Sequence, residues 1–100
     1  MKQFELKITP KAESDLLALR EAIVSAYKAP ITAKRYLEDL NATMLWLERG
    51  ADCFPSVPEL FFQYGFEIHR VNFKRMAILY SIEGTTVFIH RIMPQSMVIY

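Results

Sequence analysis

Apolar and polar side chains alternate along the start of the chain. Phe4, Leu6 and Ile8 are apolar, and the residues between them are charged or polar. A period of two is typical of a strand with one buried face. The pattern therefore predicts a strand over Gln3–Thr9.

The apolar period then lengthens to three and four positions, which is the period of an amphipathic helix. Thr9 is a favourable N-cap residue, and Pro10 suits the first helical position. Because a residue that precedes proline disfavours the helical conformation, this helix should end near Tyr27, before Pro30. The sequence thus predicts a first helix of about four turns.

A second helical pattern runs from Pro30 or Thr32 to Arg49. Gly50 is expected to end this helix in the left-handed conformation, with Arg49 in the last turn. Only a few residues separate the two helices, so they should form an antiparallel hairpin.

The region Ala51–Gly65 is punctuated by prolines and is predicted to be a loop. It is also rich in aromatic residues, so we expect it to pack against the domain, in part as a short edge strand. Three strands are predicted after it: Phe66–Phe73, Met76–Ile82 and Thr86–Met93. Met76–Ile82 is almost continuously apolar, as in a central strand that is covered on both faces.

The predicted order is strand, two helices, then three strands, which places the chain in the α+β class. An N-terminal strand, an antiparallel helical hairpin and a three-stranded antiparallel meander would form one domain over residues 1–100. The hairpin should cover one face of the sheet. The other face is expected to be concave and partly open.

The composition of the chain indicates a folded domain but does not indicate a function. Apolar residues make up 52% of the chain, which is a folded domain's composition, and the net charge of +1 neither requires nor excludes a nucleic-acid partner. The lone Cys53 rules out a disulfide within the chain. No metal site or cofactor is predicted.

The N-terminus lacks the apolar core of a signal peptide, and the longest apolar run, Met76–Tyr80, is far shorter than the roughly 20 residues of a spanning helix. We therefore expect a cytoplasmic protein.

Four stretches resemble a known family and occur in that family's order: ITPKAESDLLAL, ITAKRYLEDLNATMLWLE, FPSVPEL and RMAILYSIEGTTVFIHRI. The family is the RelE/ParE superfamily of plasmid-stabilisation type toxins from type II toxin–antitoxin systems. The resemblance implies the fold described above and neutralisation by a cognate antitoxin protein. RelE-like members are ribosome-dependent mRNA endoribonucleases, whereas ParE-like members poison DNA gyrase.

The chain departs from the nuclease branch at two places. That branch commonly has an arginine where this chain has Ala77, and a basic cluster with a histidine or tyrosine where this chain has Met93–Ser96. The ending IHRI resembles the ParE branch, in which an arginine occupies the place of Arg91, although Pro94 stands where a histidine is usual. The resemblance therefore favours a toxin that binds gyrase. A ribosome-dependent nuclease and a non-toxic antitoxin-binding module are the alternatives.

Candidate site residues follow from the remaining cations and histidines. A nuclease would need positive charge and a proton donor or acceptor, for which the catalytic candidates are Arg75, His90 and Arg91. On the last predicted strand, Arg91 is expected to share a face with Val87, Ile89 and Met93. His90 is expected to lie on the opposite face with Phe88 and Ile92. The alternative for His90 is a packed, hydrogen-bonded histidine, and for Arg91 a salt bridge to Glu67 or Glu83. Asp15 is interpreted as a solvated charge on a helix surface.

A second set of residues is predicted to contact the target or the antitoxin. Its cationic members are Arg70, Lys74, Arg75 and Arg91, and its apolar members are Met97, Val98, Ile99 and Tyr100. The apolar tail either packs back on the domain or forms a patch that a partner covers. The possible partners are the antitoxin, DNA gyrase or the ribosome with its mRNA, and a second copy of the chain in a homodimer.

Overall fold

The computed structural model describes residues 3–99 of the chain. Its helices and strands are β1 (Glu5–Ile8), α1 (Pro10–Ala26), α2 (Pro30–Gly50), α3 (Phe61–Tyr64), β2 (His69–Phe73), β3 (Met76–Glu83) and β4 (Thr86–Pro94). Short 3₁₀ turns occur at Ala51–Cys53, Pro58–Leu60 and Gln95–Met97. The predicted α+β order is confirmed. Within the described range, no helix is both long and apolar enough to cross a membrane.

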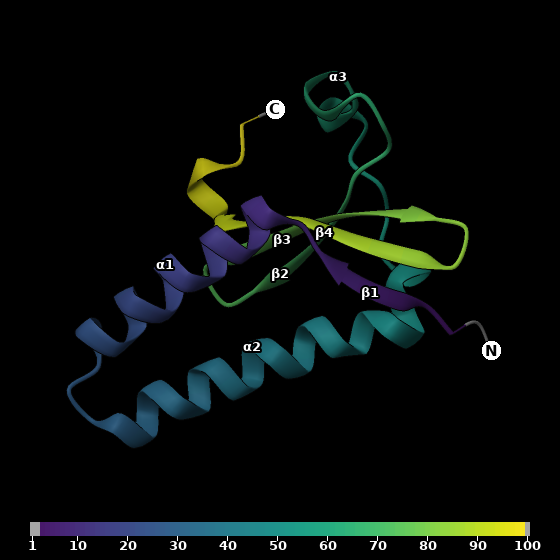
Figure 1. Cartoon of the computed structure of the whole chain (residues 1–100). Coiled ribbons are helices and arrows are strands. Elements are labelled where there is room, and N and C mark those ends of the chain that lie inside the picture. The colour runs from purple at the N-terminus through teal and green to yellow at the C-terminus, as the bar shows by residue number, and fades with distance from the viewer. Residues whose placement is uncertain (1–2, 100) are drawn as a thin grey trace.

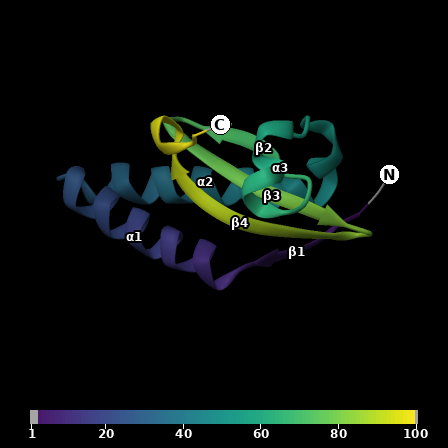
Figure 2. The same ribbon diagram turned by 90° about the horizontal axis from the view of Figure 1, so that it is seen from above.

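The strands form one mixed sheet in the order β1-β4-β3-β2. β2, β3 and β4 are the predicted antiparallel meander, and β1 pairs in parallel with β4, for example Leu6 with Val87. Figures 1 and 2 show both long helices on the same side of this sheet, with α3 and the C-terminal segment on the other side. The N-terminal strand therefore lies next to the last strand, and α1 starts beside β4.

The start of α1 follows the predicted capping chemistry. Thr9 is the N-cap, its hydroxyl accepts a hydrogen bond from the amide of Ala12 at 3.2 Å, and Pro10 is the first helical residue. The amide of Thr9 also donates to the carbonyl of Ile89 at 3.0 Å. The cap thus fixes the first turn of α1 against β4.

The end of α2 differs from the prediction. Gly50 is the last residue of α2, and its φ of −125° is not left-handed, because the chain continues directly into a 3₁₀ turn. The indole of Trp46 packs so closely on Gly50 that a Cβ atom would clash with it. The same indole meets the ring of Phe54 edge-on at 5.5 Å between centroids. Gly50 is therefore needed for the close approach of a ring rather than for a left-handed turn.

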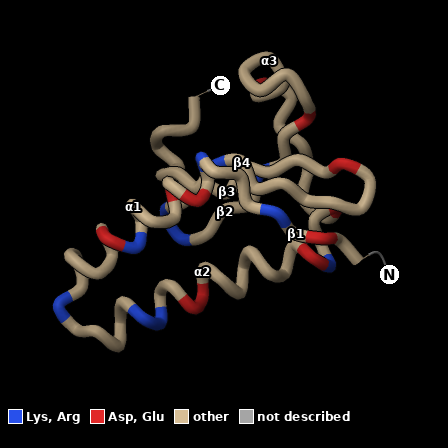
Figure 3. The backbone as a smooth tube through the Cα atoms, in the orientation of Figure 1, with Lys and Arg blue, Asp and Glu red and all other residues tan. Residues whose placement is uncertain are grey.

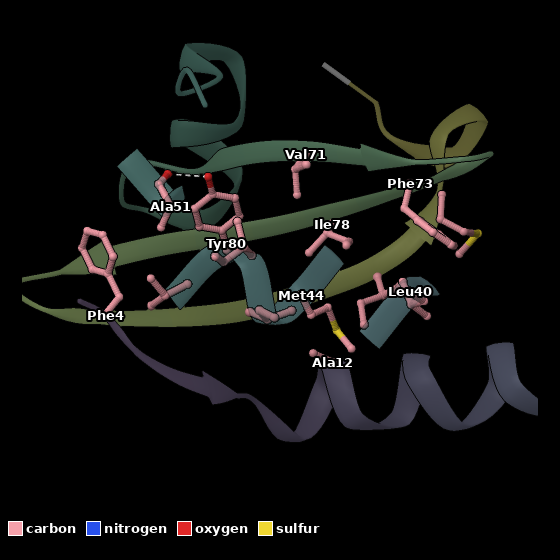
Figure 4. Packing of buried hydrophobic residues seen from close by; sticks show 14 of the residues in the cluster. Phe4, Ala12, Leu40, Met44, Ala51, Val71, Phe73, Ile78 and Tyr80 are labelled. Carbon is pink, nitrogen blue, oxygen red and sulfur yellow. Dashed lines mark hydrogen bonds between the residues drawn. The ribbon is translucent and has the colours of Figure 1, made fainter. Parts of the chain in front are cut away.

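The main core lies between the two long helices and the sheet. Leu40 and Met44 of α2 share this core with Ala12 of α1 and with Ile78 and Tyr80 of β3 (Figure 4). A smaller core of Leu60, Ile68 and Leu79 lies on the opposite face. Residues 77–80 are at most 1% exposed. The prediction of a central strand covered on both faces is confirmed.

The second face of the sheet is more covered than the sequence predicted. Val57 and Tyr64, from the segment around α3, pack on the small core, and so does Val98 from the C-terminal segment. The loop before the sheet contributes a single bridge, between Ser56 and His69, instead of an edge strand. Two separate segments thus bury the part of the sheet that was expected to stay open.

Candidate functional site

A β-bulge in β4 determines where the candidate residues point. Tyr80 pairs with Ile89, but the preceding Leu79 pairs with Arg91, so His90 is an extra residue in β4. After the bulge the alternation of faces is shifted by one residue, and Ile92 joins the main core. The expected sharing of a face by Arg91, Val87 and Ile89 is therefore wrong. Arg91 faces the second side of the sheet, in one row with Leu79 and with Arg70 of β2.

Arg91 forms an ion pair with Asp15 of α1. Its Nε donates to Asp15 Oδ2 at 2.7 Å and its Nη2 to Oδ1 at 3.3 Å, and the amide of Ile92 donates to the same Oδ2 at 3.0 Å. The two side chains are only 28% and 14% exposed. The hydrogen bonds to Asp15 raise the pKa of Arg91 further above its ordinary value. Asp15 thus neutralises Arg91 and fastens α1 to β4.

Two expectations about this pair were wrong. Asp15 is not a solvated surface charge, and the salt-bridge partner of Arg91 is neither Glu67 nor Glu83. Asp15 and Arg91 are 76 positions apart in the sequence. Arg91 reaches Asp15 at the edge of β4, which is open there because β1 pairs with β4 only as far as Ile89. Sequence periodicity does not predict the bulge at His90 that sets the face of Arg91.

His90 is a packed and hydrogen-bonded histidine, as the structural alternative predicted. Its Nε2 lies 2.8 Å from the hydroxyl of Ser81. Its ring packs against Phe66 at 4.9 Å and against Tyr64 at 6.3 Å between centroids. Burial lowers the pKa of His90, and the opposing effect of the charge on Glu83 is smaller. The neutral ring thus helps to hold the α3 segment on the sheet.

Lowering the pH is expected to destabilise the fold through His90. The pKa of His90 is lowered from 6.5 in the folded chain, so below pH 6.5 the unfolded chain takes up a proton that the folded chain does not. The free energy of unfolding should therefore fall from pH 6.5 down to the folded pKa, by at most about 1.4 kcal/mol per pH unit, and should not respond to His90 at higher pH. Urea denaturation of wild type and His90→Gln between pH 5 and 8 measures this. Equal pH dependence in both proteins would contradict it.

The basic residues of the β2–β3 turn lie apart from Arg91. Lys74 has a left-handed φ of 53°, and its ammonium lies 4.9 Å from the ring centroid of Tyr36. Arg75 is exposed, and it is four positions from Leu79, the partner of Arg91, which is about 13 Å along a strand. The carbonyl of Arg75 accepts from the amide of Gln95 at 2.8 Å, which anchors the C-terminal segment. The three catalytic candidates thus do not converge on one point.

The apolar tail is divided between the domain and the surface. Val98 packs on the second core, whereas Met97 is 60% and Ile99 is 79% exposed. The tail adds no edge strand over residues 97–99. Tyr100, the last predicted contact residue, lies outside the described residues.

The sequence reasoning missed a groove between the ends of α1 and α2. Its volume is about 590 Å³, and apolar side chains such as Val24, Tyr27 and Leu37 line it, together with Lys28 and the exposed ion pair Lys34–Glu38. The position of the groove depends on how the two helices diverge, which periodicity does not reveal. In residues 3–99, no group of three or more His, Cys, Asp or Glu is placed to hold a metal ion.

Comparison with known proteins decides the family. The family model described as the ParE toxin of the type II toxin–antitoxin system parDE matches residues 6–99. The chain belongs to the ParE toxin family. As the ParE toxin of a type II system, it has a cognate antitoxin as its partner.

A solved structure supports the ParE fold independently. The structure titled "Chromosomal ParDE TA system from P. aeruginosa" is similar with a TM-score of 0.70, and the match covers 92% of this chain and 96% of that one. At 20% sequence identity this similarity concerns the fold alone. No protein with curated annotation matches the sequence.

Proposed function

We propose that this ParE-family protein acts in the cytoplasm by binding DNA gyrase, and that its antitoxin prevents this binding. The Asp15–Arg91 ion pair is the observation that favours a binding mechanism over a nuclease mechanism. A nuclease needs a cation that is free to stabilise the charge developing on the scissile phosphate. Arg91 is instead neutralised by Asp15, His90 is packed, and Arg75 lies at the far end of β3. A toxin that acts by binding needs none of these groups.

We propose the groove between α1 and α2 as the main antitoxin site. Val24 is 59% exposed and Tyr27 is 39% exposed, so the groove presents apolar side chains to solvent. An amphipathic helix would bury these side chains, and an acidic residue beside its apolar stripe would pair with Lys28. A second copy of the chain is the alternative occupant, and the mass of the free protein in solution distinguishes the two. Other contacts with the target or the antitoxin remain proposed for Arg70, Lys74, Arg75 and residues 97–99.

The proposed mechanism predicts growth arrest without RNA cleavage. Induced expression of the chain should stop growth, and coexpression of the antitoxin should restore it. Primer extension on translated messages should show no new 5′ ends during the arrest. Cut messages would contradict the binding mechanism and favour the nuclease. Unimpaired growth despite tight antitoxin binding would favour a non-toxic antitoxin-binding module.

A further inference from the structure

Two adjacent phenylalanines project from α3 into solvent. Phe62 is 91% exposed and Phe61 is 49% exposed, and their rings meet edge-on with centroids 6.0 Å apart. Figure 1 shows α3 standing away from the sheet on the side opposite to the long helices. Exposure of so large an aromatic side chain gains nothing for the isolated fold.

The fold anchors the backbone that carries these two rings. Leu60, immediately before them, is 1% exposed in the second core, and Tyr64, immediately after them, packs on the same core. Gly65 ends the turn with a left-handed φ of 81°, and its amide donates to the carbonyl of Phe61 at 2.7 Å. Because this backbone is already ordered, the segment loses less conformational entropy on binding than a flexible loop would.

The surface around the two rings is acidic. A hollow of about 270 Å³ beside them is lined by Val57, Pro58 and Glu67 as well as by both rings. Residues 51–68 contain acidic residues but no lysine or arginine, and Figure 3 shows red and no blue at α3. Glu59 is exposed, and the side chain of Glu67 is 69% exposed although its Oε1 lies 3.3 Å from His69 Nε2.

We propose that Phe61, Phe62, Glu59 and Glu67 form the docking surface for the toxin's target, at a protein surface that has an apolar pocket with a rim of Lys and Arg. Phe62 would enter the pocket, and the two carboxylates would pair with the basic rim. Enzymes that bind DNA carry such basic surfaces to hold phosphates. The inference rests on the proposed gyrase target. It assigns the target and the main antitoxin groove to opposite sides of the sheet, so the antitoxin would prevent target binding through the bulk of the complex rather than by covering Phe62.

The test compares Phe62→Ser with Leu17→Ser, which removes an exposed apolar side chain (54%) from α1. Inhibition of purified gyrase, growth arrest and antitoxin binding are measured for both variants, and thermal unfolding followed by circular dichroism shows that each is folded. Phe62→Ser should raise the inhibitory concentration about 30-fold or more and should keep its antitoxin affinity. Leu17→Ser should behave like wild type in every assay.

The acidic residues are tested by charge reversal. Glu59→Lys should weaken inhibition, and added salt should weaken wild-type inhibition more than that of Glu59→Lys. Glu21→Lys, on the exposed side of α1, is the matched control and should have no effect.

The outcomes separate the docking surface from the identity of the target. Equal inhibition by Phe62→Ser and wild type overturns the docking surface and leaves gyrase as the target. Wild type that stops growth without affecting gyrase overturns gyrase as the target, and loss of arrest in Phe62→Ser would then still support the docking surface. Loss of antitoxin binding in Phe62→Ser contradicts the assignment to opposite sides, and a wild type that neither stops growth nor inhibits gyrase overturns both proposals.

Discussion

Replacement of Tyr80 by alanine is expected to lower the free energy of unfolding by about 3–5 kcal/mol, the usual cost of removing a large buried ring. Tyr80 is fully buried in the middle of β3, and its ring stacks on His69 at 5.3 Å between centroids. Its hydroxyl donates to the carbonyl of Ala51 at 2.6 Å (Figure 4). Burial raises the pKa of Tyr80, which keeps the hydroxyl a neutral donor. Domains of this size are stable by about 5–15 kcal/mol, so the loss would be large.

The contribution of the hydroxyl alone is measured by Tyr80→Phe. This variant keeps the ring but leaves the Ala51 carbonyl without its donor, which should cost about 1–3 kcal/mol. Tyr27→Phe, at a partly exposed ring, is the control and should change stability by less than about 0.5 kcal/mol. Chemical denaturation followed by circular dichroism measures all three variants. If Tyr80→Phe is as stable as wild type, the hydrogen bond between β3 and the end of α2 does not stabilise the fold as described.

Removal of either side chain of the Asp15–Arg91 ion pair is expected to cause the second largest decrease in the free energy of unfolding. Exposed ion pairs contribute about 0–1 kcal/mol, whereas breaking a buried pair costs about 3–5 kcal/mol. With side chains 28% and 14% exposed, this pair lies between these limits. Asp15→Ala should therefore cost about 1–3 kcal/mol, because it leaves Arg91 and the amide of Ile92 without their acceptor. Arg91→Ala should cost a similar amount.

A double-mutant cycle measures the interaction free energy between Asp15 and Arg91 apart from the other contacts of each residue. The combined Asp15→Ala, Arg91→Ala variant should be more stable than the sum of the two single losses predicts, by about 1–2 kcal/mol. The exposed pair Lys34–Glu38, at 4.0 Å, is the control cycle and should show coupling below about 0.5 kcal/mol. Folded Arg91→Ala should still stop growth, because Arg91 fastens α1 to β4 rather than contacting the target. If Arg91→Ala lost its toxicity completely but was as stable as wild type, Arg91 would be a contact residue for the target.

Local sequence patterns were sufficient for the four strands and the two long helices, but not for α3 or the 3₁₀ turns. The Thr9–Pro10 pair marked the start of α1 because capping depends only on neighbouring residues. The apolar run from Met76 marked β3 because a strand covered on both faces has no polar side. Gly50 was misinterpreted because close approach of the Trp46 ring and a left-handed turn both require glycine.

The candidate site was less predictable because it depends on contacts that are distant in sequence. The extra residue in β4 becomes visible only from the pairing of Leu79 with Arg91, and it changes the face of every later side chain. The partner of Arg91 on α1 was missed for that reason. The apolar residues of the loop were expected to pack against the domain, and Leu60 does so. Phe62 does not, and no sequence period distinguishes the two in a segment of irregular turns.

Supercoiling by purified DNA gyrase, titrated with this protein, tests the central claim most directly. The account predicts that relaxed plasmid stays unsupercoiled as the toxin is added, and that an equimolar amount of antitoxin restores supercoiling. Unchanged supercoiling at a large molar excess of toxin, in a preparation that binds its antitoxin and stops growth when expressed, would contradict the account.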